Sequence, residues 1–254
     1  MLVPKLQAMA RSGPLLCELH AHTTWSDGAL TLPELVDLYG GAGFDVLAVT
    51  DHVVRSEDPW GRQLEGRGAS LRAERAAAYF EQLAEEGERA LARYGLVLIP
   101  GLELTFDDDD PCLAAHALAI GVRDYVSLDG GLDHALAHAR ERGAALVGAH
   151  PYTLAGTRTA TRTTARFAEN AEWAATAVDR FELCNRHDFF PWVASNRLPA
   201  VATGDFHRPE HFATWKSVIP AERSEEAVVE YLRSRRPVSL ALAEPRRAPT
   251  RRAA

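Results

Sequence analysis

Short apolar segments alternate with longer segments of helical character along most of this chain of 254 residues. The short segments are typical of buried strands, and the longer ones, rich in Ala, Glu and Arg, are typical of helices. Neighbouring parallel strands need a long crossover between them, and a helix usually provides it. The alternation therefore predicts an α/β fold in which about seven strands form a closed or nearly closed barrel.

The elements can be placed along the chain from this pattern. Strands are expected at Leu15–His22, Phe44–Asp51, Leu96–Phe106, Leu113–Gly121, Ala144–His150, Arg180–Cys184 and Ala200–Thr203. Helices are expected at Leu32–Tyr39, Ser70–Tyr94, Leu132–Arg142, Thr163–Thr176, Phe189–Asn196 and Glu225–Ser234. Thr31 and Glu34 have the spacing of a capping box before the first helix, and Ser224 is the expected cap of the last one.

Residues 1–244 are expected to form a single domain, because the sequence shows no internal repeat and no linker. Residues 245–254 are rich in Pro and Arg and are expected to be disordered. No apolar run approaches the roughly 18 residues of a membrane span, and no signal peptide is expected. The three cysteines, Cys17, Cys112 and Cys184, are widely spaced, which favours buried free thiols and a cytoplasmic location.

The formal net charge of −7 argues against broad nucleic-acid binding, which needs a basic surface. The acidic side chains have another use, because nearly every predicted strand ends in a residue that could bind a metal ion. These residues are His20, His22, Asp27, His52, Glu103, His116, His150, Asp205 and His207. Active sites of α/β barrels lie at the carboxyl ends of the strands, so these side chains are expected to converge in one pocket.

A single histidine at a strand end is more often a hydrogen-bonded structural residue than a metal ligand. The joint pattern favours metal, because many charges buried in one cavity would otherwise be costly. Residues i and i+2 of a strand point to the same face, so His20 and His22 can reach one ion, and Asp205 and His207 repeat that spacing. Imidazole and carboxylate ligands suit zinc, manganese or iron.

Several short motifs resemble those of the polymerase and histidinol phosphatase (PHP) family and occur in the order in which that family has them. They are HAHTTWSDG, AVTDH, GLELT, the isolated His116, GAHPY and GDFH. The resemblance covers the chain from about Leu15 to about Leu240. It implies a distorted (β/α)7 barrel, similar to a TIM barrel, with two or three divalent metal ions at the C-terminal ends of the strands.

Carried over position by position, the resemblance also implies which residues hold each ion. It assigns one ion to His20, His22 and Asp205, a second to His116 and His150 with Glu103 as the bridge, and a third to Asp27, His52 and His207. The family often has His where Asp27 stands, although the Ser-Asp-Gly form is also common among its phosphoesterases. All nine positions are occupied by residues that can bind metal.

The implied activity is that of a metal-dependent phosphoric ester hydrolase. A water shared by two cations ionises near neutral pH, and the hydroxide is expected to attack a small phosphorylated metabolite or nucleotide. The expected catalytic residues are Glu103, Asp205 and His207, and one of the last two is expected to take or deliver a proton. Because guanidinium groups suit phosphate, the expected substrate-binding residues are Arg158, Arg186 and Arg208, with His187 near the mouth of the site.

Two other functions stay open at this point. Some PHP domains are proofreading exonucleases within polymerases, so a 3′–5′ exonuclease on single-stranded nucleic acid is one alternative, although this chain shows no basic groove. A non-phosphate amidohydrolase or a metal-binding regulatory protein is the other. No membrane partner is expected, and the sequence leaves the oligomeric state open.

Overall fold

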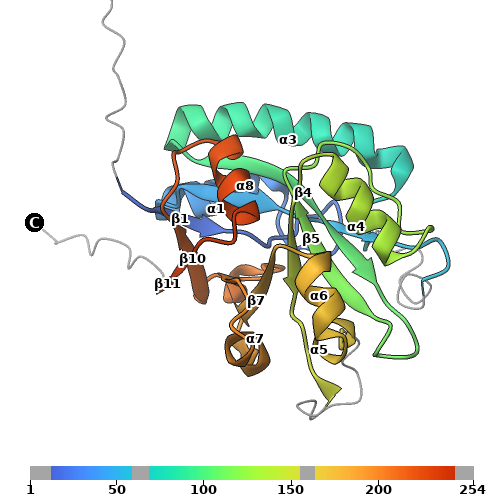
Figure 1. The fold of residues 1–254 in the computed structure, drawn as a ribbon. Coiled ribbons are helices and arrows are strands. Elements are labelled where there is room, and N and C mark those ends of the chain that lie inside the picture. The colour runs from blue at the N-terminus through green and yellow to red at the C-terminus, as the bar shows by residue number, and fades with distance from the viewer. Residues whose placement is uncertain (1–12, 59–68, 155–163, 244–254) are drawn as a thin grey trace, which may run out of the picture.

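The computed structural model describes residues 13–58, 69–154 and 164–243, so the predicted tail at 245–254 lies outside the described residues. The described residues form a mixed α/β structure whose sheet curls into a half-barrel (Figure 1). The strands are β1 (Leu15–Glu18), β2 (Val46–Val49), β3 (His52–Val54), β4 (Val97–Phe106), β5 (Ala115–Ile120), β6 (Ala145–Ala149), β7 (Arg180–Asn185), β8 (Asp188–Phe189), β9 (Ala200–Thr203), β10 (Trp215–Ile219) and β11 (Ser239–Leu242). The helices are α1 (Leu32–Ala42), α3 (Ala73–Tyr94), α4 (Leu132–Glu141), α5 (Arg166–Glu169), α6 (Ala171–Ala177), α7 (Pro191–Ser195) and α8 (Glu225–Arg233), with a 3-10 turn, η2, at Pro209–His211.

The strands follow the order β11-β10-β1-β2-β4-β5-β6-β7-β8, with β3 beside β4 and β9 beside β7. Strands β1, β2 and β4 are parallel to one another, as are β6, β7 and β9. The sheet curls until the residues that follow β9 meet those that follow β1, where Ala21 pairs with Phe206. The curled α/β sheet agrees with the fold class that the sequence indicates, and the (β/α)7 count stays a prediction.

Strand β5 corrects the expectation of a parallel sheet, because it is antiparallel to both β4 and β6. Only residues 107–114 separate β4 from β5, and so short a connection returns the chain in the opposite direction. Strands β10 and β11, which the sequence analysis did not predict, add an antiparallel pair beside β1. The described part of the predicted helix Thr163–Thr176 consists of two helices, α5 and α6, that meet at Asn170.

The ends of the helices follow local sequence signals. Both the backbone N–H and the hydroxyl of Thr31 donate to the carboxylate of Glu34, so the predicted capping box is present at α1. Gly43 ends that helix with a φ of 85°, in the left-handed region that glycine adopts without strain. The hydroxyl of Ser224 accepts a hydrogen bond of 3.2 Å from the N–H of Ala227, which confirms Ser224 as the cap of α8.

Apolar side chains pack on both faces of the curled sheet. Alternate residues of the strands fill the inner face, where Leu15, Cys17 and Leu19 follow one another along and after β1. Helix α8 joins this inner cluster at one end of the barrel, where Val229 lies directly against Gly121. Gly121 follows β5 at the end opposite His116. Helix α8 therefore closes the end of the barrel away from the predicted metal ligands.

Within the described ranges, no helix is both long and apolar enough to cross a membrane. All three cysteines are free thiols, and Cys17 and Cys184 are buried as predicted. Cys112 is partly exposed because it lies in the loop between β4 and β5. The prediction of a buried thiol is therefore wrong at this position.

Candidate metal centre

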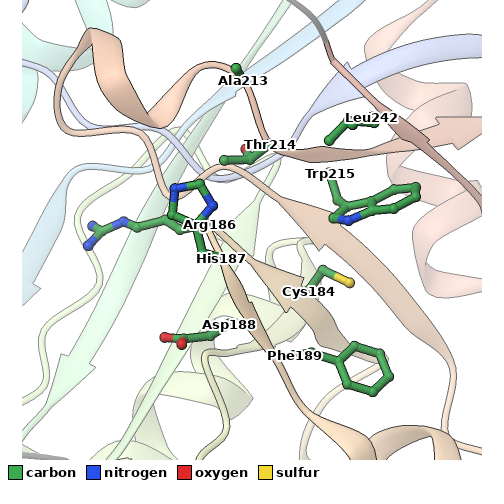
Figure 2. A pocket seen from close by; sticks show the side chains of 9 residues that line it. All are labelled: Cys184, Arg186, His187, Asp188, Phe189, Ala213, Thr214, Trp215 and Leu242. Carbon is green, nitrogen blue, oxygen red and sulfur yellow. The ribbon is translucent and has the colours of Figure 1, made fainter.

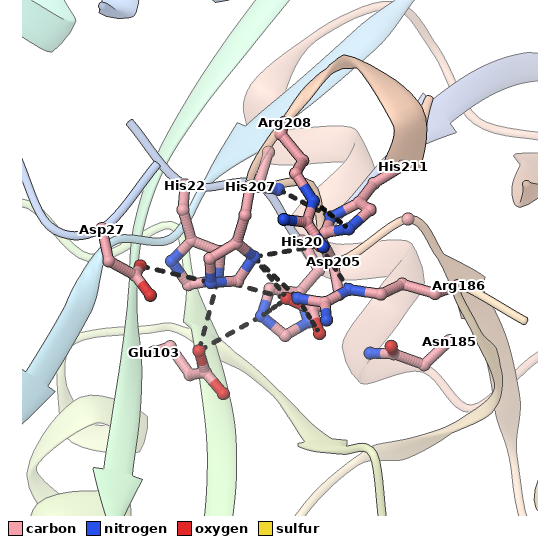
Figure 3. Close-up of polar contacts among 12 residues, drawn as sticks. His20, His22, Asp27, Glu103, Asn185, Arg186, Asp205, His207, Arg208 and His211 are labelled. Carbon is pink, nitrogen blue, oxygen red and sulfur yellow. Dashed lines mark hydrogen bonds and ion pairs between the residues drawn. The ribbon is translucent and has the colours of Figure 1, made fainter. Parts of the chain in front are cut away.

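The nine predicted ligands lie together at the open end of the barrel. The two motifs with i, i+2 spacing are side by side there, because the N–H of His22 donates to the carbonyl of Phe206 (2.8 Å) and the N–H of Phe206 donates to the carbonyl of His20 (3.0 Å). These bonds place His20 and His22 next to Asp205 and His207 from the opposite end of the chain. Figure 3 shows this group with Asp27 and Glu103 facing it.

Glu103 stands at the centre of the group, and its two carboxylate oxygens face different histidines. Oε2 lies 3.2 Å from His20 Nε2, 3.3 Å from His22 Nε2 and 2.8 Å from His52 Nδ1. Oε1 lies 3.2 Å from His116 Nδ1 and 3.2 Å from His150 Nε2. One fully buried carboxylate thus connects two separate sets of imidazoles, which is the arrangement of a bridging ligand.

A further set of donor atoms surrounds Asp27. Its Oδ1 lies 3.2 Å from His207 Nε2 and 3.5 Å from His52 Nε2. The ring of His22 packs between those of His52 and His207, with centroid distances of 4.2 and 4.1 Å. One donor atom from each of these four residues falls within 4.8 Å of the others. The structure therefore brings Asp27, His52 and His207 together as the sequence predicts, and adds His22 to the set.

The surroundings of His22 indicate whether these residues fit a metal ion. Its side chain is fully buried, yet neither ring nitrogen makes a hydrogen bond within the described residues. Its Nε2 is faced by Oε2 of Glu103 at 3.3 Å and by Oδ1 of Asp205 at 3.5 Å. An unsatisfied buried imidazole is costly, and a cation held between this nitrogen and the two carboxylates would satisfy all three. The donor set therefore fits divalent metal.

Charges within the site shift several pKa values. Burial alone would raise the pKa of Glu103, but His52 and His20 hold it well below its usual range. Burial would likewise raise the pKa of Asp205, and His20 holds that pKa low as well. Burial and the neighbouring imidazolium charges hold the pKa of His22 well below its usual range. His22 is therefore neutral, the form in which imidazole binds metal.

Several ligands are held through a second atom by residues that the sequence analysis missed. Glu182 accepts from His20 Nδ1 (2.8 Å), Thr105 lies 2.7 Å from His52 Nδ1, and Asp107 lies 3.0 Å from His116 Nε2. Such partners fix the orientation of a ligating imidazole. The signal that could have revealed Glu182 is a carboxylate between the apolar residues Phe181 and Leu183 of a strand, since a buried charge needs a partner.

The ligands surround a cavity of about 330 Å³, which is lined by Asp27, His52, His116, His150, Tyr152, Asn185, Arg186, Asp188, Asp205 and His207. Three of these residues, His150, Arg186 and Asp205, have positive φ values of 27°, 49° and 42°. Non-glycine residues rarely adopt this conformation, and it is concentrated at functional sites. The backbone thus bends sharply at three points around the cavity.

Of the predicted substrate-binding residues, Arg186 lies in the cavity. Its guanidinium lies 3.0 Å from Asp205 Oδ2 and 2.8 Å from His207 Nδ1, and it donates to the carbonyl of Asp205 (3.0 Å). Its side chain remains 35% exposed, which leaves part of the group accessible from the cavity. Arg186 therefore both holds two predicted ligands and faces the space where a substrate would bind.

The other predicted substrate-binding residues lie elsewhere. Arg208 is outside the cavity lining, with its Nε 3.3 Å from His211 Nε2, while His211 Nδ1 accepts from the N–H of His207 at 3.2 Å. His187 is exposed and lines a neighbouring pocket of about 360 Å³ on the β7–β8 hairpin (Figure 2). Arg158 lies outside the described residues. The structure thus does not bring Arg208 or His187 into the metal cavity.

No family model matches the chain, and no curated protein matches it. Among solved structures, the chain is similar to a two-domain protein from Bacteroides vulgatus that contains a predicted PHP-like metal-dependent phosphoesterase. The two share 23% sequence identity and superpose with a TM-score of 0.65, over 95% of this chain and 68% of that one. This similarity establishes a common fold.

Two further solved structures are similar over less of the chain. One is a putative metal-dependent phosphoesterase from Bifidobacterium adolescentis, with a TM-score of 0.46, and the other is an amidohydrolase from Chromobacterium violaceum with bound sulfate and no metal, with a TM-score of 0.49. Each shares 16% identity over 76% of this chain and 88% of its own. Similarity at this level does not by itself establish a common fold. The resemblance to the PHP family that the motifs indicate is confirmed, at the level of the fold, by the Bacteroides protein: this chain has a PHP-like fold.

Proposed function

We propose that this protein is a metal-dependent phosphoesterase that hydrolyses a small phosphorylated metabolite or nucleotide. The observation that carries the proposal is the position of Glu103, which directs one carboxylate oxygen toward each of two sets of imidazoles. A buried carboxylate shared in this way suits two divalent ions held close together. Paired ions of this kind serve enzymes that attack phosphate esters with water.

The residues that would hold the ions are those that the motifs indicate. One ion would be held by His20, His22 and Asp205, and a second by His116 and His150, with Glu103 as the bridge between them. A third would be held by Asp27, His52 and His207. The geometry adds that His22 lies between the first set and the third, since its ring is close to donors of both. Mixed imidazole and carboxylate sets suit zinc, manganese or iron.

Bound divalent ions would lower the pKa of a coordinated water and neutralise charge that develops on the phosphoryl oxygens. The protein's own residues would bind the phosphate group and transfer the proton. Arg186, partly exposed in the cavity, would donate to a phosphate oxygen through the part of its guanidinium that Asp205 and His207 do not occupy. Asp205 and His207 both line the cavity, and one of them would take or deliver a proton.

The size and charge of the site favour a small substrate. A cavity of about 330 Å³ lies at the low end of the range for small-molecule sites. The formal net charge of −7 would repel a polyanionic strand outside the metal centre. A small monoester, which presents its charge to the ions and to Arg186 alone, is the better match.

The proposal is tested by metal analysis followed by a screen of phosphate esters with Mn²⁺, Zn²⁺ or Fe²⁺ added. Release of inorganic phosphate from small monoesters is expected, and Glu103→Ala and His207→Ala are expected to abolish it. Arg233→Ala is a matched control, because Arg233 is an exposed arginine of α8 at the end of the barrel away from the ligands and should leave turnover nearly unchanged. Turnover that survives both site variants would refute this site.

The same screen separates the alternatives. Shortening of labelled single-stranded DNA, without phosphate release from small monoesters, would indicate an exonuclease. Hydrolysis of amides in place of esters would indicate an amidohydrolase. Stoichiometric metal binding with no turnover of any of these substrates would indicate a regulatory metal-binding protein.

A further inference from the structure

Glu182 is a fully buried carboxylate that touches two predicted ligands from different metal sites. Four groups donate to it: His20 Nδ1 (2.8 Å) and the hydroxyl of Thr203 (2.6 Å) to Oε1, and the N–H of His150 (2.5 Å) and the amide of Asn185 (2.6 Å) to Oε2. Both oxygens are therefore saturated. Within the described residues, no cation forms an ion pair with Glu182 other than His20.

A bulge in β7 makes this arrangement possible. Glu182 pairs with Val201 of β9, and the next paired residue of β7 is Cys184, opposite Ala202, so Leu183 is an extra residue on the β7 side. In a regular strand, residues three apart point to opposite faces. Because the bulge shifts the alternation by one residue, Glu182 and Asn185 can hydrogen-bond to each other on the same face.

The contact with His20 determines which ring nitrogen faces the centre. A carboxylate only accepts hydrogen bonds, so Nδ1 of His20 must carry a proton to donate to Glu182. Nε2 then points toward Glu103 Oε2 at 3.2 Å and Asp205 Oδ1 at 3.5 Å. Nε2 is thus the nitrogen left to bind an ion, and Glu182 prevents the ring from turning over.

The contact with His150 acts on the backbone. His150 has a φ of 27°, which is unfavourable for a residue with a side chain. Its N–H is held by Glu182 and its carbonyl accepts from the hydroxyl of Thr164 at 2.7 Å. These two bonds keep the peptide in the conformation that directs the imidazole to Glu103 Oε1.

We propose that Glu182 is a positioning residue that holds the ligands of two neighbouring metal ions in register: the ring of His20 and the backbone of His150. The proposal rests on the metal centre proposed above. Its consequence is that one substitution, at a residue that binds no ion itself, weakens binding at both sides of the Glu103 bridge.

The test compares the wild-type chain with Glu182→Gln. A glutamine keeps the shape of the side chain but offers only one acceptor oxygen, so it cannot satisfy four donors. Two quantities are measured: the affinity of the full chain for Zn²⁺ or Mn²⁺ alone, and the exchange with water of the proton on His20 Nδ1, followed by NMR of the metal-free chain. Glu182→Gln is expected to weaken ion binding by about 10- to 100-fold and to speed this exchange.

Asp45→Asn is the matched control. Asp45 is also a buried carboxylate, bound to the N–H of Leu16 (2.9 Å) and paired with Arg223, but it contacts none of the predicted ligands. Asp45→Asn is expected to lower the stability of the fold. Its ion affinity and the exchange rate of its His20 Nδ1 proton are expected to equal those of the wild type.

Unchanged ion affinity in Glu182→Gln overturns the proposal. Weaker affinity with an unchanged exchange rate of the His20 Nδ1 proton overturns it too. If Glu182→Gln does not fold, Thr203→Val decides, because it removes one donor to the carboxylate and leaves the charge in place. Thr203→Val should weaken ion binding and speed exchange of the His20 Nδ1 proton, both by less than Glu182→Gln does. If neither quantity changes, the proposed role of Glu182 is refuted. A wild-type chain that binds neither ion would refute the metal centre, while the NMR measurement would still show whether Glu182 holds the ring.

Discussion

His116 and His207, like His20, hold a proton unusually strongly at the open end of the barrel. Burial alone would lower the pKa of both, but Asp107 raises the pKa of His116 to about 10, and Asp205 with Asp27 raises that of His207 to about 10. At neutral pH both are therefore positively charged in the metal-free protein. A metal ion can bind them only after these protons leave.

Metal affinity is consequently expected to rise with pH. Since the metal-free form keeps these protons below a pH of about 10, each must be displaced on binding, and affinity should increase from about pH 6 to about pH 9. Titration calorimetry in buffers of different ionisation enthalpy would count the released protons. His116→Ala should release fewer protons on metal binding than the wild type does. A metal affinity that does not depend on pH would contradict these protonation states.

Lys216 and Glu18 form a buried ion pair next to the metal centre. Lys216 Nζ lies 2.5 Å from Glu18 Oε2, and Glu18 Oε1 accepts from the N–H of Gly204 at 2.8 Å, directly before Asp205. A Cβ at Gly204 would lie 2.2 Å from Nζ, so a side chain at this position would displace the ion pair. The pair therefore supports the turn that carries Asp205.

Removal of one partner is expected to cost more than removal of both. Lys216→Met leaves the Glu18 charge buried and unpaired and should destabilise the fold by about 3–5 kcal/mol in urea unfolding. Combining it with Glu18→Gln should restore part of that loss. The exposed pair of Arg123 and Glu225 provides the comparison, since Arg123→Met should cost no more than about 1 kcal/mol. Equal losses in the free energy of unfolding for Lys216→Met and Arg123→Met would contradict this account.

At the scale of the elements, Arg180 joins β7 to the end of α8. Its fully buried guanidinium donates to the carbonyls of Leu232 (2.7 Å), Tyr231 (3.1 Å) and Arg236 (2.7 Å). The last carbonyls of a helix have no partner within the helix, so this side chain supplies one. Helix α8 is thereby held against the end of the barrel that lies away from the metal ligands.

Arg180→Met is expected to lower the free energy of unfolding by about 2–4 kcal/mol, because it removes charged hydrogen bonds from buried carbonyls. Denaturant unfolding would measure the loss. Arg233→Met, an exposed arginine in the last turn of the same helix, should change stability by less than about 0.5 kcal/mol. Similar losses for the two variants would show that Arg180 does not hold the helix.

The elements also show what the sequence could reveal and what it could not. Strands such as β1 and β4 were predictable, because apolar alternation and the residues at their ends are local signals. The direction of β5 was not, because it depends on a short connection that carries no apolar pattern. Strand β10 was missed because it buries Lys216, which only its contact with distant Glu18 makes acceptable. Glu182 was missed for a similar reason, since the bulge that directs it requires pairing with β9.

For the molecule as a whole, the ions are expected to contribute to stability. An ion that binds only the folded chain stabilises it by about 2.7 kcal/mol when its free concentration is about 100 times its Kd. Adding Mn²⁺ or Zn²⁺ to the metal-free protein should therefore raise Tm, and a chelator should reverse the rise. Glu103→Ala should abolish the shift, and a shift that persists in this variant would indicate that the ions bind elsewhere.

The pairing of Ala21 with Phe206 has a consequence for biosynthesis. His20 and His22 are translated well before the segment that lies against them, which carries Asp205 and His207. A nascent polypeptide that stops before Asp205 has the first motif without its neighbour, and the seam of the barrel stays open. The complete set of proposed ligands can therefore form only after Asp205 and His207 have also emerged from the exit tunnel.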